Sequence, residues 1–238
     1  MPVKVPGISG VTDIATMQGG TCVVVHDSTV SCWGTWTRFD DAPDSDSDRV
    51  EPQPYTVAGT SGARSVQLGG GYACAVLASG TMRCWGNDRD DQIGAPDSAT
   101  TMGVVLQPFD VTRATAISQV ALLGATNCVL HGSGNVRCWG RDIAANLDSV
   151  VDLPVRGAID LGLTYGVSHV YVITSDHVLH AWENDHKGSL LPFETAPLEA
   201  LQISGGEFAA CALAIDSSVH CWGDDASATG MPIVIPAR

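Results

Sequence analysis

The chain repeats one motif five times, and this repeat constrains the fold more than any other feature. Four copies carry two cysteines ten positions apart with Trp-Gly directly after the second: "TCVVVHDSTVSCWG" (21–34), "ACAVLASGTMRCWG" (73–86), "NCVLHGSGNVRCWG" (127–140) and "ACALAIDSSVHCWG" (210–223). A fifth copy, "VYVITSDHVLHAWE" (170–183), keeps the apolar run, the turn and the tryptophan. An apolar run, a short polar turn and a second alternating run predict a β-hairpin.

The spacing of the cysteines predicts a disulfide across each hairpin. Ten residues around a central turn place two positions opposite each other, at a Cα separation within disulfide range. The fifth copy has lost both members of the pair together, with Tyr171 and Ala181 in their places. Buried free thiols are the alternative, and a zinc site is disfavoured because its ligands are more closely spaced. The expected bonds are Cys22–Cys32, Cys74–Cys84, Cys128–Cys138 and Cys211–Cys221.

The repeats recur every 40 to 54 residues, a period typical of propellers built from strands. Each unit adds two more short apolar segments to the hairpin, so it supplies about four strands, which is one propeller blade. We therefore predict an all-β chain: one β-propeller domain over residues 1–238 with about five four-stranded blades. The expected repeats are 8–59, 60–112, 113–157, 158–197 and 198–238.

The two ends of the chain bear on how the array is completed. A proline-bearing segment such as "PYTVAG" occurs six times, whereas the hairpin occurs five times. One terminal segment is therefore expected to complete a blade, and the other is surplus or marks an array left open. A closed ring of five blades is the first expectation, and an open arc or one completed by a dimer is the second.

The block "GGGYACAVLASGTMRCWGNDRDDQIG" resembles the repeats of the regulator of chromosome condensation family. That family has a Gly-rich strand, a hairpin of small residues, Trp-Gly and a turn like Asn-x-x-Gly-Gln-Leu-Gly. Asn87, Gln92, Ile93 and Gly94 match this turn, with Asp90 or Asp91 near its usual glycine. The resemblance implies a propeller, although members usually have seven blades.

The resemblance also implies several modes of binding. Eukaryotic members act as exchange factors for the Ran GTPase and touch chromatin, while a secreted bacterial member inhibits β-lactamases by offering one propeller face. The second style suits this chain better, because its formal charge is −14. Such a charge disfavours nucleic acid and anionic membrane as partners.

Composition also indicates a compartment. Four disulfides are typical of an oxidising environment, so we expect an extracellular, periplasmic or cell-surface protein. The first residues, "MPVKVPGISG", lack the pattern of a secretion signal, and the expectation is that one has been removed. No apolar run approaches the length of a membrane helix.

Three departures from the repeat are candidate sites. The first is a long insertion in blade 1, "TWTRFDDAPDSDSDRVEPQ". Trp36, Arg38 and Phe39 have the composition of an interface hot spot and are predicted to bind a protein partner. The alternative is that both aromatic side chains pack under their own loop.

The same insertion contains a series of alternating carboxylates. Asp44, Asp46 and Asp48 resemble the first half of a calcium loop, but Arg49 and Tyr55 occupy the positions of its turn glycine and bidentate glutamate. We therefore expect no cofactor, with calcium as the weaker alternative. A solvated acidic rim, joined by Asp88, Asp90, Asp91 and Asp97 of blade 2, would select a basic partner.

The third departure is a group of histidines in blade 4. His169, His177, His180 and His186 lie near Asp176, Glu183 and Asp185 in the sequence. His177, His180 and Asp176 are the candidates for acid–base or metal chemistry in a lyase, hydrolase or cyclase. The alternative is a degenerate blade with exposed histidines.

The favoured interpretation is a non-catalytic propeller that presents the acidic and aromatic loops of blades 1 and 2 to a protein. An enzyme using the blade 4 residues and a structural domain of a larger surface protein are the alternatives. No Gly-x-Ser-x-Gly, His-Glu-x-x-His or phosphate-loop motif is present in the sequence.

Overall fold

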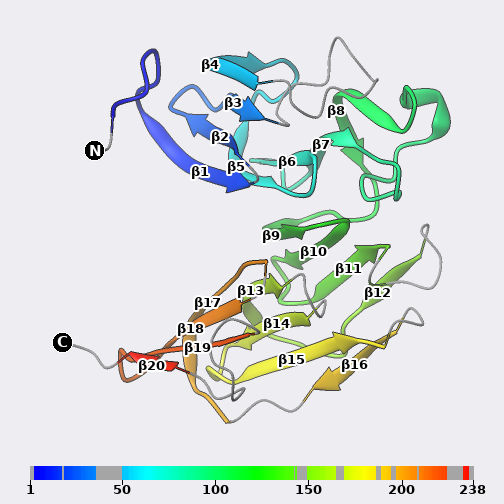
Figure 1. Ribbon diagram of the computed structural model, residues 1–238. Coiled ribbons are helices and arrows are strands. Elements are labelled where there is room, and N and C mark those ends of the chain that lie inside the picture. The colour runs from blue at the N-terminus through cyan, green and yellow to red at the C-terminus, as the bar shows by residue number, and fades with distance from the viewer. Residues whose placement is uncertain are drawn as a thin grey trace. The chain divides into compact units, whose positions relative to one another are not determined.

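The structure is a computed structural model that describes residues 3–17, 19–35, 50–141, 143, 149–164, 169–185, 189–193, 197–207, 209–223 and 233–235. These residues form five four-stranded sheets, here called blades 1 to 5 (Figure 1). Each blade contains four strands that are consecutive in the sequence and hydrogen-bonded to their neighbours. The predicted number of blades and of strands per blade is confirmed.

The strands follow the repeat closely. Blade 1 is β1 Val11–Met17, β2 Gly20–Val25, β3 Val30–Thr35 and β4 Val50–Val57. Blade 2 is β5 Ala63–Leu68, β6 Tyr72–Leu77, β7 Met82–Asn87 and β8 Val104–Val111. Blade 3 is β9 Ile117–Leu123, β10 Thr126–His131, β11 Val136–Gly140 and β12 Val150–Asp152. Blade 4 is β13 Ala158–Thr164, β14 His169–Thr174, β15 Leu179–Asn184 and β16 Leu190–Phe193. Blade 5 is β17 Ala200–Gly205, β18 Ala209–Ala214, β19 Val219–Gly223 and β20 Ile233–Ile235.

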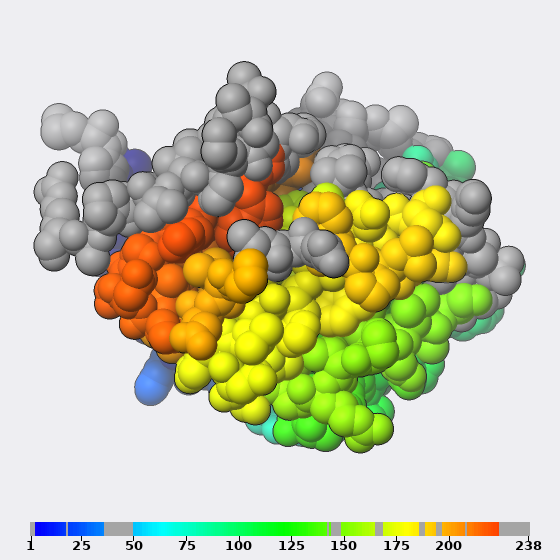
Figure 2. Space-filling model, turned by 90° about the horizontal axis from the view of Figure 1, so that it is seen from below, coloured from blue at the N-terminus to red at the C-terminus, as the bar shows by residue number. Residues whose placement is uncertain are grey.

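The chain divides into two compact units, Met1–Ile117 and Ser118–Arg238. The first unit holds blades 1 and 2, and the second holds blades 3, 4 and 5 apart from the first residue of β9. Figure 2 shows blade 4 in yellow beside blade 5 in orange within the second unit. The expectation of a single propeller domain over residues 1–238 stays a prediction.

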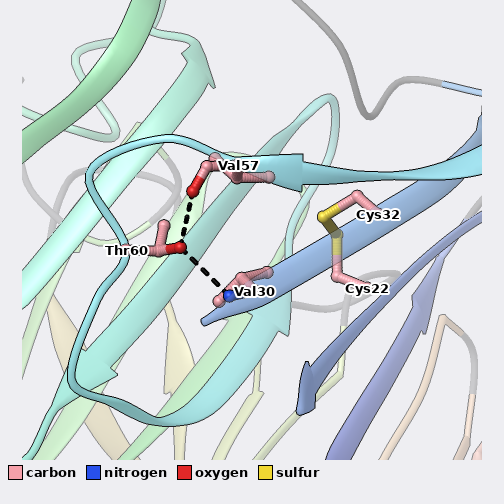
Figure 3. Close-up of a disulfide and its surroundings, with 5 residues drawn as sticks. All are labelled: Cys22, Val30, Cys32, Val57 and Thr60. Atoms are coloured by element: carbon pink, nitrogen blue, oxygen red, sulfur yellow. Dashed lines mark hydrogen bonds between the residues drawn. A yellow bond between two sulfur atoms is a disulfide. The ribbon is translucent and has the colours of Figure 1, made fainter. Parts of the chain in front are cut away.

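The central hairpin of each blade has the predicted register. Each cysteine lies directly opposite its partner, and all four pairs are bonded at a Cα–Cα distance of 4.1 Å. In blade 4 the same register pairs Tyr171 with Ala181. The predicted disulfides are thus confirmed, and the bond Cys22–Cys32 is drawn in Figure 3.

Each hairpin turns through one residue in the left-handed conformation. Its φ lies between 62° and 79° in all five blades, at Ser28, Gly80, Gly134, His177 and Ser217. A three-residue loop that ends in such a residue is a common hairpin connection.

The carbonyl of this turn residue also joins one blade to the next. It accepts a hydrogen bond of 2.7–3.0 Å from the first residue of the following blade, in the pairs Ser28–Ala63, Gly134–Ala158 and His177–Ala200.

The hydrophobic core lies between successive blades. In the first unit, the Cys22–Cys32 disulfide and Val24 pack against Ala63 and Val66 of the next blade. In the second unit, residues of blade 4 pack in the same way against blade 5. Because apolar burial stabilises by about 25 cal/mol per Å², these junctions stabilise each unit.

The repeated tryptophans contribute to this core. Trp85, Trp139 and Trp182 are buried, whereas Trp33 and Trp222 are half-buried. The Trp222 ring meets Tyr171 edge-on at a centroid distance of 5.3 Å, a favourable aromatic geometry.

The terminal proline-bearing segments differ. The C-terminal segment supplies β20, which pairs with β19 and completes blade 5. The described part of the N-terminal segment, residues 3–10, forms no strand. Blade 5 is therefore completed by its own following segment, and the N-terminal segment is the surplus copy.

Candidate functional site in the blade 2 loop

The predicted site residues of the blade 1 insertion lie outside the described residues. These are Trp36, Arg38 and Phe39, expected to bind a partner, and Asp44, Asp46 and Asp48, the alternative calcium ligands. The insertion joins β3 to β4, so its ends, Thr35 and Val50, lie at the end of the sheet opposite the β2–β3 turn. Both predictions remain predictions.

The candidate acid–base residues of blade 4 have separate local roles. His177 is the left-handed residue of the hairpin turn, with φ +68°. His180 lies in β15, where its ring is 6.1 Å from that of Trp182. Asp176 is exposed and accepts a hydrogen bond of 2.5 Å from the Thr174 hydroxyl, and this bond lowers the pKa of Asp176. Each side chain thus belongs to a turn or a strand surface.

A different pair from the same group is close together. His169 and Glu183 lie at neighbouring positions of β14 and β15, with His169 Nε2 3.8 Å from Glu183 Oε2. The His169 ring is buried and lies 5.0 Å from Phe193 and 5.8 Å from Tyr171, measured between centroids. These contacts describe a histidine packed into an aromatic environment.

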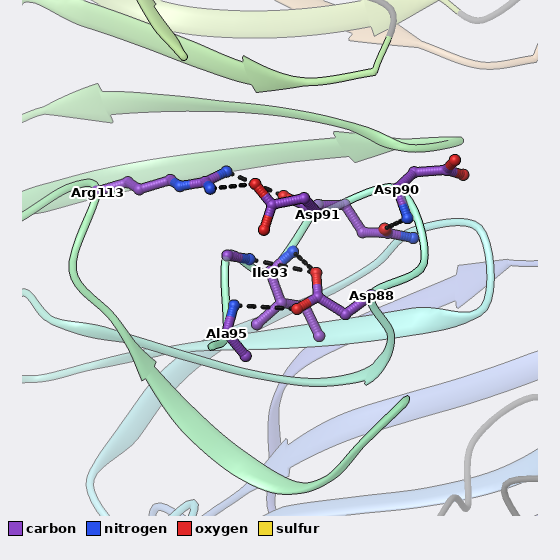
Figure 4. A network of polar contacts seen from close by, with 8 residues as sticks. Asp88, Asp90, Asp91, Ile93, Ala95 and Arg113 are labelled. Atoms are coloured by element: carbon purple, nitrogen blue, oxygen red, sulfur yellow. Dashed lines mark hydrogen bonds and ion pairs between the residues drawn. The ribbon is translucent and has the colours of Figure 1, made fainter. Parts of the chain in front are cut away.

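The best-defined loop connects β7 to β8 in blade 2, at residues 88–103, and is drawn in part in Figure 4. The buried side chain of Asp88 holds the backbone of this loop in place. Its carboxylate accepts backbone hydrogen bonds from Ile93 at 2.6 Å, Gly94 at 3.2 Å and Ala95 at 3.0 Å. Burial raises the pKa of Asp88, and the three amide donors oppose this effect.

A second link fixes the loop to the chain beyond β8. The Arg113 guanidinium forms an ion pair with the Asp91 carboxylate and donates a hydrogen bond of 2.9 Å to the Asp91 carbonyl (Figure 4). Asp91 has φ +52°, a conformation that glycine adopts most easily. The sequence comparison expected a glycine near Asp90 or Asp91, and the backbone at Asp91 explains that expectation.

These contacts remove two of the four blade 2 carboxylates from the predicted acidic rim. The Asp88 carboxylate binds backbone amides of the loop and the Asp91 carboxylate pairs with Arg113, so both residues are structural. Asp97 is exposed and Asp90 is half-buried, and these two remain candidates for contact with a basic partner. Among the described residues, no group of three or more His, Cys, Asp or Glu side chains is arranged to hold a metal ion.

The tip of this loop displays a methionine that sequence reasoning missed. Met102 and Gly103 have φ of 52° and 74°, and Thr101 pairs with Val104 across them, as in a type I′ turn. The Met102 side chain is 59% exposed. The sequence held a signal for this turn, because Gly103 directly precedes the β-branched pair Val104-Val105 and glycine is typical of tight hairpin turns.

The turn is tied to the body of the loop. The Asp88 amide donates a hydrogen bond of 2.8 Å to the Gly103 carbonyl, and Arg89 Nε donates one of 3.3 Å to the Met102 carbonyl. A left-handed conformation costs a non-glycine residue about 1–2 kcal/mol. The loop therefore holds an exposed, flexible, apolar side chain in a fixed and unfavourable backbone conformation. Such strain clusters at functional sites.

No protein-family model and no curated protein matches the sequence. The structure is similar to several solved propellers. Human WBSCR16 has a TM-score of 0.73 and 12% identity over 95% of this chain and 67% of its own. Prp20p from Saccharomyces cerevisiae, studied for its binding to Gsp1p and histones, has a TM-score of 0.71 and 15% identity over 95% of this chain and 63% of its own. Yeast RCC1 (Prp20) bound to Kap60 has a TM-score of 0.69, with 15% identity over 94% and 63%.

These likenesses confirm a β-propeller fold similar to that of RCC1. The chain spans about two thirds of the length of these structures, at 63% to 67%. The identities are low, so the comparison establishes the fold.

Proposed function

We propose that the protein is a non-catalytic β-propeller that binds a protein partner through the loops of blades 1 and 2. The observation that carries this proposal is Met102, exposed on a strained turn that a buried network holds in place. Methionine adapts to varied apolar surfaces, and a loop ordered in advance loses little entropy on binding.

The wider context supports a protein partner. Similar propellers include Prp20p, which binds Gsp1p and histones, and yeast RCC1 in complex with Kap60. The formal charge of −14 favours a partner with basic groups around an apolar centre and disfavours nucleic acid or anionic membrane. In blade 4, His177 is a turn residue, the His180 ring lies beside Trp182 and Asp176 accepts a hydrogen bond from Thr174, and these local roles favour binding over catalysis.

The disulfides support a location. Four bonds within four hairpins are typical of proteins in oxidising compartments, so we place the protein outside the cell, in the periplasm or at the cell surface. No helix among the described residues is long and apolar enough to cross a membrane.

The test begins with the oxidised protein as bait in the extracellular fluid or cell envelope of its source. The captured partner is identified, and its affinity is measured for the wild type, for Met102→Ala and for a variant lacking residues 36–49. Because a hot-spot residue contributes at least ~2 kcal/mol, we expect Met102→Ala to weaken binding about 30-fold. We also expect deletion of the insertion to weaken it.

The matched control is Ile159→Ala, which removes an aliphatic side chain that is 46% exposed in blade 4. This change should leave the affinity unaltered. Equal affinities for all variants would show that the partner binds elsewhere and would reject the blade 1 and 2 loops as the site.

A further inference from the structure

The same junction between blades is built repeatedly within the two units. The first and fourth residues of a blade's first strand pack into the hairpin of the blade before it. These residues are almost fully buried: Ala63 and Val66 are 3% and 0% exposed, Ala158 and Leu161 7% and 3%, and Ala200 and Ile203 0% and 4%.

Polar contacts fix the register of the junction. The amide of the first residue donates to the turn carbonyl of the preceding blade, as Ala200 does to His177. The amide of the fourth residue donates to the side chain at the third position of the preceding first strand. Val66 N–H lies 2.8 Å from Asp13 Oδ2, and Ile203 N–H 2.7 Å from Asp160 Oδ2.

In blade 1, the first strand has the apolar residues that would pack into a preceding hairpin, but these residues are exposed. Val11 and Ile14 occupy the first and fourth positions of β1, as their pairing with β2 shows. Val11 is 42% exposed and Ile14 is 60% exposed, whereas their counterparts in blades 2, 4 and 5 are buried. A β-branched residue at each position offers an apolar surface of the kind that the other junctions bury.

Blade 5 carries the other half. In blade 1 the receiving face consists of Cys22, Val24, Val30 and Cys32, each at most 1% exposed and packed against blade 2. The equivalent residues of blade 5 are all half-buried: Cys211, Leu213, Val219 and Cys221. At the third position of β17, Gln202 is exposed and offers a carbonyl oxygen where Asp13 and Asp160 offer a carboxylate.

We infer that blade 5 of one copy of the chain receives blade 1 of a second copy, in the arrangement by which blade 4 receives blade 5. Val11 and Ile14 fill the face around Cys211 and Leu213, the Val11 amide donates to the Ser217 carbonyl, and the Ile14 amide donates to Gln202. A second copy is the occupant because it supplies a first strand with the same register and side chains that the chain already uses. Such a contact joins different surfaces, so two copies either close a ring or continue the array.

The test is sedimentation velocity of the full oxidised chain across a range of concentrations. The wild type should change from monomer to dimer or larger species as concentration rises. Ile14→Asp removes the blade 1 surface and Leu213→Asp removes the blade 5 surface, so each variant alone should stay monomeric. An equimolar mixture of the two retains one intact junction and should form a dimer that grows no further.

Two results would overturn the inference: a wild type that stays monomeric at every concentration, or variants that associate as the wild type does. A monomer in which Ile14 is protected from solvent would indicate that another part of the same chain covers it. Ile159→Asp, at an exposed second position of β13, is the control and should associate normally.

Circular dichroism and the count of free thiols verify folding of each variant. If Leu213→Asp does not fold, Gln202→Lys alters the same face at an exposed side chain. The inference is independent of the partner site, because Met102 lies in blade 2, in neither proposed contact surface.

Discussion

The carbonyl oxygen of His177 accepts a hydrogen bond of 2.7 Å from the amide of Ala200, and this link joins blade 4 to blade 5. His177 makes it from the left-handed conformation that Gly134 adopts for the equivalent bond to Ala158. An imidazole therefore stands where another blade has a glycine. The position of His177 is explained by the backbone of the turn.

Replacement of His177 by glycine should stabilise the protein. Relief of the left-handed conformation gains about 1–2 kcal/mol, and the greater flexibility of glycine in the unfolded chain offsets about half, for a net gain of ~0.5–1 kcal/mol. Urea unfolding followed by circular dichroism measures this change. The opposite kind of change can be made at the equivalent turn position of blade 2. Gly80→Ala should destabilise the protein, because φ is +79° and the new Cβ would lie 3.1 Å from Ala116 Cα. A less stable His177→Gly protein would contradict the assignment.

Thr60 illustrates how polar groups are satisfied inside a junction (Figure 3). Its fully buried hydroxyl donates to the Val57 carbonyl at 2.7 Å and accepts from the Val30 amide at 3.0 Å. Thr60→Val keeps the shape but leaves both backbone groups without that partner, which should cost about 1–3 kcal/mol in unfolding free energy. Thr56→Val, at an exposed position of β4, is the comparison and should change stability by no more than about 0.5 kcal/mol. Equal effects at the two sites would refute this role for Thr60.

The disulfides should contribute to stability one hairpin at a time. Replacing Cys74 and Cys84 together by alanine opens a loop of ten residues, and the chain-entropy model assigns such a loop roughly 2–3 kcal/mol. Denaturant unfolding under non-reducing conditions gives the loss directly. If the double variant were as stable as the wild type, the bond would add nothing beyond the packing already present in blade 2.

Asp152 gives a prediction about pH. The hydrogen bond from Arg137, at 2.6 Å between Nε and Oδ1, lowers the pKa of Asp152 below its usual value of 3.8. A carboxyl whose pKa is lower in the folded protein stabilises it above the unfolded pKa and loses this effect as pH falls through the folded pKa. The stability difference between wild type and Asp152→Asn should therefore be constant near neutral pH and shrink below about pH 4.

The difference in unfolding free energy between wild type and Asp152→Asn should be small. The Asp152 side chain is 64% exposed, so solvent screening limits the pair to about 0.2–1 kcal/mol. Unfolding at several pH values and at low and high salt provides the measurement. A difference that grew as pH fell would reverse the sign of the linkage and count against the ion pair.

Gly140 should tolerate no side chain. Its φ is +112°, and an added Cβ would lie 2.0 Å from the Ala125 carbonyl oxygen, which belongs to the backbone. Strained conformations alone cost about 1–3 kcal/mol, so Gly140→Ala should lose more than ~2 kcal/mol once the clash is included. Gly7→Ala is the matched control, because Gly7 has φ +78° with nothing within 4 Å. Similar losses at both sites would show that conformation, and not the clash, determines the cost.

The blades and the disulfides could be predicted from the sequence, because both follow from the repeated motif. Cysteine pairing follows from a period-two register around a short turn, and the absence of both cysteines at Tyr171 and Ala181 identified the bonded partners. The repeated segment at both ends of the chain was ambiguous, because residues 3–10 and 233–235 have similar composition but only the latter form a strand.

The burial of equivalent residues and the roles of single polar side chains could not be predicted, because both depend on the neighbouring parts of the folded chain. Ile14 and Val66 occupy equivalent positions with similar side chains, yet one is 60% exposed and the other is buried, because burial is decided by the neighbouring blade. His177 and His180 suggested chemistry from their spacing alone, whereas the first is a turn residue and the second a strand residue. The acidic loop of blade 2 likewise divides into structural and exposed carboxylates only once its hydrogen bonds are known.

Every disulfide closes a hairpin within one blade, so no described covalent bridge crosses from one blade to another. A protease that cuts once between blades 1 and 2, for example near Gly59, would release fragments that remain together only by packing and backbone hydrogen bonds. Oxidised protein nicked at such a site should separate in denaturant without any reducing agent. Resistance of the protein to proteolysis is thus set by the weakest connection between blades, because the disulfides hold together only the hairpins in which they lie.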